Sequence, residues 1–488
     1  MREAGILLHI SSLPGKYGVG TLGECAYKFV DFLKKSGQKI WQILPIGQTV
    51  YGDSPYSPIS AFAYNPYFID FDLLLNDGLI KEEDLPNEFH TSRVNYDYLY
   101  KTNYPILSKA YLNHKLYLDE FNEFKESNDD WLDDYSLFMV LREIQEYKPW
   151  NLWYHDAKYK NIVHINWIKE NYKKRLDEYK FYQFLFYKQF KALKDYANKN
   201  GILIMGDMPI YCSYDSVDVW ANPKDFDLDE NLSPKFVAGC PPDMFSSKGQ
   251  LWGNPLYDWN KMKNDKYKFW VKRVKYSFKL YDILRIDHFR GFAGYYAIPS
   301  GDSDATRGHW EVGPGYDLFK EINNNLGDRR IVAENLGFLT KDVFKLLDKC
   351  GYPGMVIFQF ELGDGMRHSP IKKEFKSNNI FYTGTHDNQT IMSFYNQQNE
   401  LYKSLIDKVC NISIMDKPNF KIIEYAMKTK CDVVIIPIQD YLGLTDEDGR
   451  MNLPSTVSNS NWSYMAREFD FSNDLAKYIK RITKESGR

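Results

Sequence analysis

The chain has 488 residues, of which 44% are hydrophobic and 26% are charged, so it is long enough to bury a sizeable core. Its 62 basic and 65 acidic side chains give a net charge of -3, which provides no electrostatic reason to expect a nucleic acid or an anionic membrane as partner. Its six cysteines are scattered without a CxxC pair, which is typical of reduced thiols and argues against a disulfide framework or a zinc site.

No targeting or membrane-spanning segment is predicted. The first apolar run is short for a signal peptide, and the acidic Glu3 lies directly before it. No apolar stretch approaches the roughly 18 residues that are needed to span a bilayer. We therefore expect a soluble, cytoplasmic protein.

Eight short apolar runs recur along the chain, and each closes on polar or glycine-rich residues. Continuous apolar runs of this length are typical of parallel strands that are buried on both faces. Segments such as 25–37 and 340–351 lie between them, carry apolar residues at helical spacing and end on glycine. The alternation predicts an α/β fold, a (β/α)8 TIM barrel. The predicted strands lie in 5–12, 39–47, 201–210, 282–289, 330–337, 354–361, 379–388 and 432–440.

Two gaps between the predicted strands are too long for simple crossovers. The first gap contains strongly periodic text at 176–201 and predicts a mostly helical inserted subdomain at about 73–198. The second is rich in Pro, Gly, Asp and Ser, and predicts an inserted loop subdomain at about 211–280 that covers the active site. We expect residues 1–488 to form a single catalytic barrel with these two insertions.

Acidic side chains stand where the predicted strands end. In a (β/α)8 barrel the active site lies at the C-terminal ends of the strands. Asp207, Asp287, Glu334 and Asp387 each follow a different apolar run, and His386 precedes the last of them. Each acid alone could be a turn or helix-capping residue. Their repetition at the same end of several strands favours one shared site.

Carboxylates around one pocket suit the cleavage of glycosidic bonds. One ionised carboxylate attacks the anomeric carbon, and a second, protonated one donates its proton to the leaving oxygen. Arg285 lies two residues from Asp287, on the same face of the strand, so we expect its charge to lower the pKa of Asp287. The acid, Glu334, should instead have a raised pKa. The same Arg285–Asp287 pair could also be an ordinary buried ion pair.

A metal site is the main chemical alternative at this mouth. His288 and His386, with Asp287 and Asp387, have the side chains of a His/carboxylate metal site. However, no HxH pair ends any of the predicted strands. We therefore expect no metal there.

Longer motifs through the chain resemble one known family. They include "SSLPG", "WQILPIG", "GDMPIYCSYDSVDVWANP", "PPDMFSSKGQLWGNPLY", "LRIDHFRGF", "VAENLG" and "GTHDNQT". Over nearly its whole length the chain resembles the amylomaltases, or disproportionating enzymes, which are 4-α-glucanotransferases of glycoside hydrolase family 77 in the α-amylase clan. The resemblance implies transfer of α-1,4-glucan segments from one maltodextrin to another or to glucose, by a retaining double displacement without a cofactor.

The resemblance also assigns roles to residues. It implies that Asp287 is the nucleophile that forms a covalent glycosyl-enzyme, Glu334 the acid/base and Asp387 the stabiliser of the transition state. Arg285 is expected to orient Asp287, and Tyr51 matches a tyrosine of a second, remote glucan site in some members. The other implied substrate-binding residues are Tyr56, Asp207, Asp243, Phe245, Gln250, Trp252, Asn335 and His386.

Two positions depart from the family pattern. Met244 stands where some members have an aromatic residue, and Ser455 stands where the family usually has glycine. Neither position belongs to the three implied catalytic carboxylates.

Rival functions remain open on the sequence alone. An α-1,4-glucan hydrolase would use the same carboxylates, and a non-catalytic glucan-binding protein would keep the pocket without turnover. The expected partners are maltooligosaccharides, glucose and α-1,4-glucan, with no nucleic acid and no membrane. We expect a monomer or a weak homodimer.

Overall fold

The centre of the molecule is a sheet of parallel strands. The computed structural model describes residues 2–49, 52–89, 91–242, 246–337, 339–362 and 375–488. Eight strands lie in the order β10-β11-β12-β1-β2-β3-β6-β9, all in parallel register, and each overlaps one of the predicted apolar runs. The strands are β1 (Glu3–Leu7), β2 (Ile40–Gln42), β3 (Leu203–Met208), β6 (Ile283–Ile286), β9 (Ile331–Ala333), β10 (Gly354–Ile357), β11 (Asn379–Tyr382) and β12 (Val433–Pro437).

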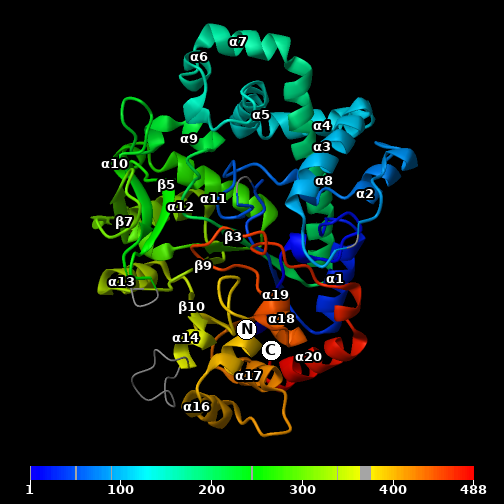
Figure 1. The fold of residues 1–488 in the computed structure, drawn as a ribbon, viewed down its shortest axis with the longest axis vertical. Coiled ribbons are helices and arrows are strands. Elements are labelled where there is room, and N and C mark those ends of the chain that lie inside the picture. Colours follow the sequence, from blue (N-terminus) through cyan, green and yellow to red (C-terminus); the bar gives the residue numbers. More distant parts are fainter. Residues whose placement is uncertain (1, 50–51, 90, 243–245, 338, 363–374) are drawn as a thin grey trace.

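The sheet closes into a barrel between β9 and β10. The N–H of Ala333 donates to the carbonyl of Pro353 at 2.9 Å. Next to this bond, the N–H of Met355 donates to the side-chain oxygen of Asn335 at 2.7 Å, so a side chain continues the seam where backbone pairing stops. The expected (β/α)8 barrel is therefore confirmed, with helices around it and insertions between its strands (Figure 1).

Helices cover the barrel and fill the first long insertion. In α1 the buried positions Ala26, Phe29, Val30 and Leu33 share one face, and the helix ends before Gly37, whose φ of 74° suits glycine. The helices are α1 (Glu24–Lys35), α2 (Phe71–Asn76), α3 (Tyr96–Leu112), α4 (Leu118–Glu126), α5 (Asp129–Ile144), α6 (His155–Lys158), α7 (Ile162–Asn171), α8 (Lys173–Lys199), α9 (Val217–Ala221), α10 (Trp259–Asn264), α11 (Lys268–Leu280), α12 (Tyr316–Leu326), α13 (Lys341–Cys350), α14 (Phe358–Leu362), α15 (Ile391–Gln397), α16 (Glu400–Cys410), α17 (Pro418–Lys428), α18 (Ile438–Leu442), α19 (Asp446–Gly449) and α20 (Asn473–Glu485).

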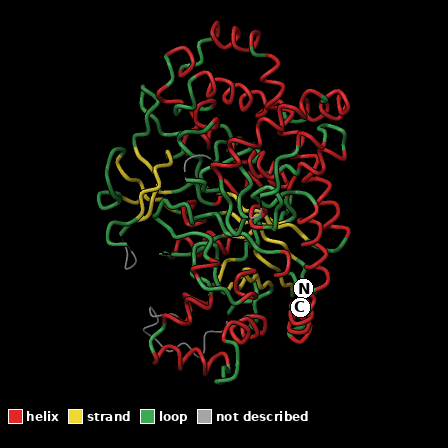
Figure 2. Tube along the Cα trace, turned by 45° about the vertical axis from the view of Figure 1, so that its right-hand side comes forward, coloured by secondary structure: helices red, strands yellow, loops and turns green. Residues whose placement is uncertain are grey.

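A second, antiparallel sheet lies beside the barrel, in the region expected to form loops. Its strands run in the order β5-β4-β7-β8 and form the outer group of yellow strands in Figure 2. They are β4 (Phe236–Cys240), β5 (Gln250–Pro255), β7 (Gly294–Pro299) and β8 (His309–Val312). Two of these strands, β4 and β5, fall in the second long gap and pair with each other, and β4 also pairs with β7, which follows β6. The division of the chain into a barrel, a helical subdomain and a loop subdomain stays a prediction.

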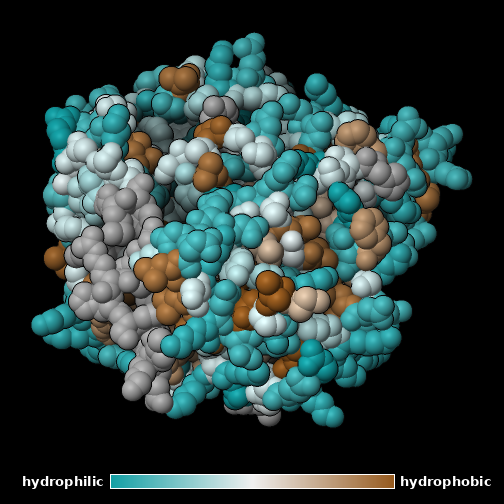
Figure 3. Space-filling model, turned by 60° about the horizontal axis from the view of Figure 1, so that its bottom comes forward, coloured by the Kyte–Doolittle hydropathy of each residue, from teal (hydrophilic) through white to brown (hydrophobic). Residues whose placement is uncertain are grey.

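The face drawn in Figure 3 shows mostly hydrophilic side chains with small groups of hydrophobic ones. Within the described residues, no helix combines the length and apolar character that crossing a membrane requires. The two ends of the chain lie side by side (Figure 1), where the Arg488 side chain donates to the carbonyl of Glu3 at 3.2 Å.

The long helix α8 is joined to the β2–α2 connection by glutamine side chains. The Gln183 amide accepts from the N–H of Tyr64 at 2.7 Å and donates to its carbonyl at 3.0 Å. Six residues further, Gln189 makes the same pair of bonds with the backbone of Asp70, at 2.8 and 3.1 Å. Both glutamines are buried, so they give hydrogen-bond partners to backbone groups in the core.

We expect Gln183→Leu to lower the free energy of unfolding by about 2–4 kcal/mol, because it leaves both backbone groups of Tyr64 buried without partners. Chemical denaturation followed by circular dichroism measures the change. Lys191→Gln is the control on the same helix, since its ion pair with Asp195 is exposed and contributes little. Equal stability of Gln183→Leu and the wild type would contradict this account.

Candidate active site

The predicted acidic residues lie together at one end of the barrel. Asp207 pairs with Arg285 in the β3–β6 register. The ladder then continues past the strand ends, because the N–H of Asp287 donates to Met208 at 3.0 Å and that of Glu334 donates to Ile286 at 3.0 Å. Parallel strands bring their C-terminal ends to the same mouth, so neighbouring strands hold these carboxylates in fixed order.

A buried guanidinium joins two of the carboxylates. Nη1 of Arg285 donates to both oxygens of Asp207, at 2.6 and 2.7 Å, and to Oδ1 of Asp287 at 3.1 Å. The hydroxyl of Tyr56 donates to Asp207 at 2.8 Å. Arg285 therefore contacts Asp287, as predicted, but its shorter bonds are to Asp207.

The Glu334 carboxylate is held by backbone donors. Oε2 accepts from the N–H of His288 at 2.8 Å, and Oε1 accepts from the N–H of Leu336 at 2.6 Å. His288 has a φ of 45°, in the left-handed region that non-glycine residues rarely adopt. This backbone turn lies directly after β6 and aims the N–H at Glu334. The sequence carries no glycine or asparagine at this position, and therefore no local signal for the turn.

Asp387 lies in the connection between β11 and α15. Its Oδ1 accepts from Nδ2 of Asn452 at 2.7 Å and lies 3.4 Å from Nε2 of His386. The ring of His386 stacks on that of Tyr56, with centroids 4.8 Å apart, and both rings contact Trp462. Asn452 was missed in the sequence, because it follows Asp387 by 65 residues and ends no predicted strand.

Burial raises the pKa of two of the carboxylates, Asp287 and Glu334. It raises the pKa of Asp287 to about 7, although Arg285 acts in the opposite direction, and it also raises the pKa of Glu334. The predicted low pKa of Asp287 is therefore wrong, because the loss of hydration outweighs the guanidinium. The raised pKa of Glu334 agrees with the prediction.

Asp387 and His386 shift each other's pKa in opposite directions. Burial acts to raise the pKa of Asp387, but the neighbouring His386 and the Asn452 amide lower it to about 2. Burial acts to lower the pKa of His386, and the Asp387 carboxylate outweighs it and raises that pKa. Asp387 is therefore ionised at neutral pH while a proton can be held at Asp287 or Glu334.

The second insertion brings an indole to the mouth. The ring of Trp252 lies edge-on to His288, with centroids 4.9 Å apart, and its Nε1 donates to Gln250 at 3.0 Å. Trp252 keeps 37% of its surface exposed, so its ring is available to a ligand. Three other predicted positions, Tyr51, Asp243 and Phe245, lie outside the described residues, as does Met244.

Two further positions singled out in the sequence, Asn335 and Ser455, lie in the described part of the chain. Asn335, predicted to bind substrate, uses its side-chain oxygen in the barrel seam at Met355. Ser455, at the position where glycine is usual, has a φ of 61°, which is the conformation that favours glycine. Within the described residues, no group of three or more His, Cys, Asp or Glu side chains has the arrangement of a metal site.

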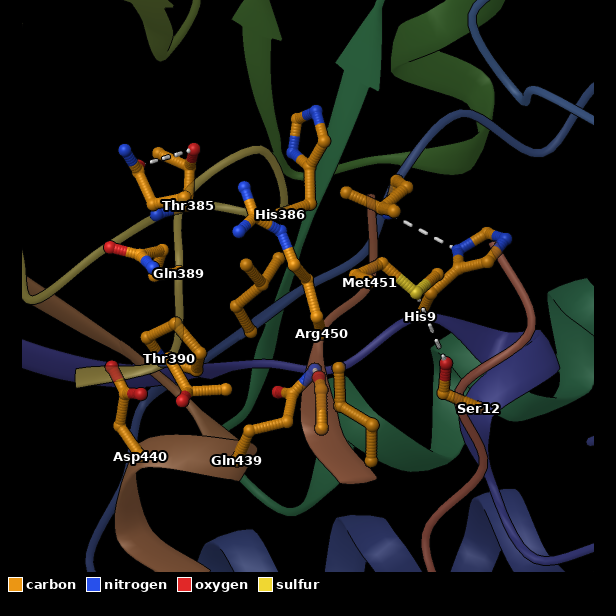
Figure 4. A pocket seen from close by; sticks show the side chains of 16 residues that line it. His9, Ser12, Thr385, His386, Gln389, Thr390, Gln439, Asp440, Arg450 and Met451 are labelled. Carbon is orange, nitrogen blue, oxygen red and sulfur yellow. Dashed lines mark hydrogen bonds between the residues drawn. The ribbon is translucent and has the colours of Figure 1, made fainter. Parts of the chain in front are cut away.

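A pocket lies beside this mouth, between the ends of β1, β11 and β12 (Figure 4). The connection that carries His386 forms one of its walls, and His9 and Arg450 form others. Burial lowers the pKa of His9 to about 3, so this imidazole is neutral, and its Nδ1 accepts from the N–H of Leu44 at 3.2 Å. The pocket therefore lies on the inner side of the Asp387 connection.

Comparison with known proteins agrees with this geometry. The family model described as 4-alpha-glucanotransferase matches residues 8–469. A 4-alpha-glucanotransferase of Clostridium butyricum is 44% identical over 489 residues, covering 99% of this chain and 100% of the relative. One of Streptococcus pneumoniae (strain TIGR4) is 42% identical over 474 residues, covering 96% and 94%.

Solved structures share the whole fold. An amylomaltase from Streptococcus agalactiae in complex with acarbose has a TM-score of 0.96 and 37% identity, and the match covers 100% of both chains. The amylomaltase of Corynebacterium glutamicum, at 16% identity, shares the fold with a TM-score of 0.80 over 99% of this chain and 75% of that one. The chain therefore belongs to the 4-alpha-glucanotransferase family, the glycosyl-transferring enzymes to which its motifs pointed.

Proposed function

We propose that the protein transfers α-1,4-glucan segments between maltodextrins, or to glucose, by a retaining double displacement. The observation that carries the proposal is a mouth with three carboxylates in different surroundings: Asp287 beside a guanidinium, Glu334 held by two backbone N–H groups, and Asp387 beside His386 and the Asn452 amide. Asp287 and Asp387 keep 27% and 46% of their side-chain surface accessible to a ligand. Glu334 is almost buried, as suits an acid that must hold its proton.

In the first step, a carboxylate oxygen of Asp287 attacks the anomeric carbon of the donor glucan. Glu334 donates its proton to the glycosidic oxygen, the bond between that oxygen and the anomeric carbon breaks, and the reducing-side fragment leaves with the proton. The remaining glucan is then an ester of Asp287. Asp387 binds hydroxyl groups of the same sugar and stabilises the positive charge that develops on its ring.

In the second step, Glu334 accepts the proton of the 4-hydroxyl group of an acceptor sugar. The acceptor oxygen attacks the anomeric carbon and releases the Asp287 carboxylate, so two inversions give net retention. Transfer exceeds hydrolysis where the acceptor occupies the mouth and excludes water, and Trp252 offers a ring on which such a sugar can stack.

The direct bond from Arg285 to Asp287 supports this division of roles. One proton shared by Asp287 and Glu334 relieves the repulsion between them, and the guanidinium of Arg285 favours the ionised form of Asp287. The proton is then on Glu334 in the reactive form. Acarbose bound to the Streptococcus agalactiae amylomaltase supports maltooligosaccharides as ligands of this chain. The expectation of a monomer or weak homodimer stays open.

Incubation with maltotriose alone tests transfer against hydrolysis. We expect glucose together with maltodextrins longer than maltotriose, because each glycosyl-enzyme passes its glucan to another sugar. Chromatography of the products measures the distribution. Products that are all shorter than maltotriose would instead identify a hydrolase.

Replacing the nucleophile separates turnover from binding. We expect Asp287→Asn to lower kcat at least about 10⁴-fold while the Kd for acarbose changes less than about tenfold, since the amide keeps the shape but does not attack. Kinetics on maltotriose and calorimetry measure the two quantities. Asp474→Asn, on the exposed side of α20, is the control. Undiminished turnover by Asp287→Asn would refute the covalent mechanism.

The pH profile of kcat/KM should be bell-shaped. Activity falls on the acid side when the pair of Asp287 and Glu334 takes up a second proton, and on the alkaline side when it loses its only one. Because burial raises both pKa values, the acid limb should lie well above pH 4, and Asp387, with a pKa of about 2, adds no limb there. Rates from pH 4 to pH 9 would contradict this if they stayed constant down to pH 4.

A further inference from the structure

A buried carboxylate with no part in the proposed chemistry lies behind the mouth. Asp440, in α18, is 2% exposed and lines the pocket of Figure 4, where it and the ring of His386 lie at opposite ends. Burial raises its pKa to about 6, so its ionised form is costly in this place. The cost of burying this carboxylate must be offset by the hydrogen bonds that it accepts.

Its two oxygens hold the two ends of one connection. Oδ2 accepts from the hydroxyl of Thr383 at 2.5 Å, and Oδ1 accepts from the N–H of Ile391 at 2.8 Å. Thr383 is the first residue after β11, and Ile391 is the first residue of α15. The residues between them include His386 and Asp387. A single side chain therefore clamps the whole segment that presents Asp387 to the mouth.

Neighbouring groups form hydrogen bonds with the second half of the same segment. The Gln359 amide donates to the carbonyl of Gln389 at 2.7 Å, and Asp446 accepts from the N–H of Thr390 at 2.7 Å. Arg450 then reaches from Asp446, at 2.9 Å, to the carbonyl of Asp387, at 3.3 Å. These bonds hold the second half of the segment, whereas Asp440 bonds to both of its ends, Thr383 and Ile391.

Capping of α15 does not by itself explain Asp440. The helix has its own N-cap, Thr390, whose hydroxyl accepts from the N–H of Ser393 at 3.3 Å. A residue needed only for the helix would not also bond to Thr383, which lies before the segment, at the end of the strand. The two bonds of Asp440 lie on either side of Asp387 in the chain, so they affect the position of Asp387.

We propose that Asp440 is a positioning residue, which keeps Asp387 in place for the transition state by holding Thr383 and Ile391 together. The inference rests on the role proposed for Asp387. A displacement of about 1 Å at a group that acts in the transition state is enough to reduce the rate markedly, while binding of the ground state is less sensitive. Loosening the clamp should therefore act on kcat more than on KM.

The test removes one bond of the clamp from the full-length protein. Asp440→Ala would leave Thr383 and Ile391 without an acceptor and could unfold the region, so the variants are Thr383→Val, which lacks the hydroxyl, and Thr383→Ser, which keeps it. We expect Thr383→Val to lower kcat about tenfold with KM for maltotriose within about twofold of wild type. Thr383→Ser should stay within about twofold in kcat.

The same substitution in an Asp387→Asn background distinguishes positioning from a general loss of structure. If Thr383 acts through Asp387, Thr383→Val should cause no further fall in the residual turnover or in the affinity for acarbose of Asp387→Asn. A further tenfold fall would show that Thr383→Val acts elsewhere, and overturn the inference. Wild-type kcat for Thr383→Val would also overturn it.

Other results would contradict the proposed function of Asp387 and not the role of the clamp. Full activity of Asp387→Asn itself would remove the role of Asp387, whatever Thr383 does. A fall in kcat for Thr383→Ser equal to that for Thr383→Val would show that the hydroxyl does not matter and that packing at the strand end does. Thermal unfolding of each variant checks that the chain is folded, and a loss of the folded state in Thr383→Val but not in Thr383→Ser would count against a role confined to position.

Discussion

The mouth of the barrel depends on one buried positive charge, the guanidinium of Arg285. With 3% of its surface exposed, Arg285 has lost most of its hydration, and a charge in that position is stable only with close partners. Asp207 supplies two short bonds and Asp287 a longer one. Tyr56 bonds to Asp207 and stacks on His386, so residues from four parts of the chain meet around this charge.

The parallel ladder then gives each carboxylate a different environment. Asp287 contacts the guanidinium, Glu334 accepts from two backbone N–H groups, and Asp387 is paired with His386 and an amide. The three acids are close in kind, but their pKa values are shifted differently because their partners and their exposure differ. An enzyme that needs a nucleophile, an acid and a fixed anion in one pocket can obtain all three from the same residue types in this way.

The insertions contribute what the barrel alone lacks. The antiparallel sheet brings Trp252 against His288, next to both Asp287 and Glu334. Its pairing was not predicted from the sequence, because the second long gap is rich in turn-forming residues and its strand β4 pairs with β7, which follows β6 in the chain. Such pairing over long sequence distances leaves no local pattern.

The sequence by itself determined the eight barrel strands, their order and which of them end in acidic residues, because a strand buried on both faces requires a continuous apolar run and a polar stop. Only the tertiary structure decided the left-handed turn at His288, the contact of Asn452 with Asp387 and the pKa of Asp287. The reason is physical: the identity of a strand depends on its own residues, whereas hydrogen bonds between distant segments and the hydration of a charge depend on everything packed around them.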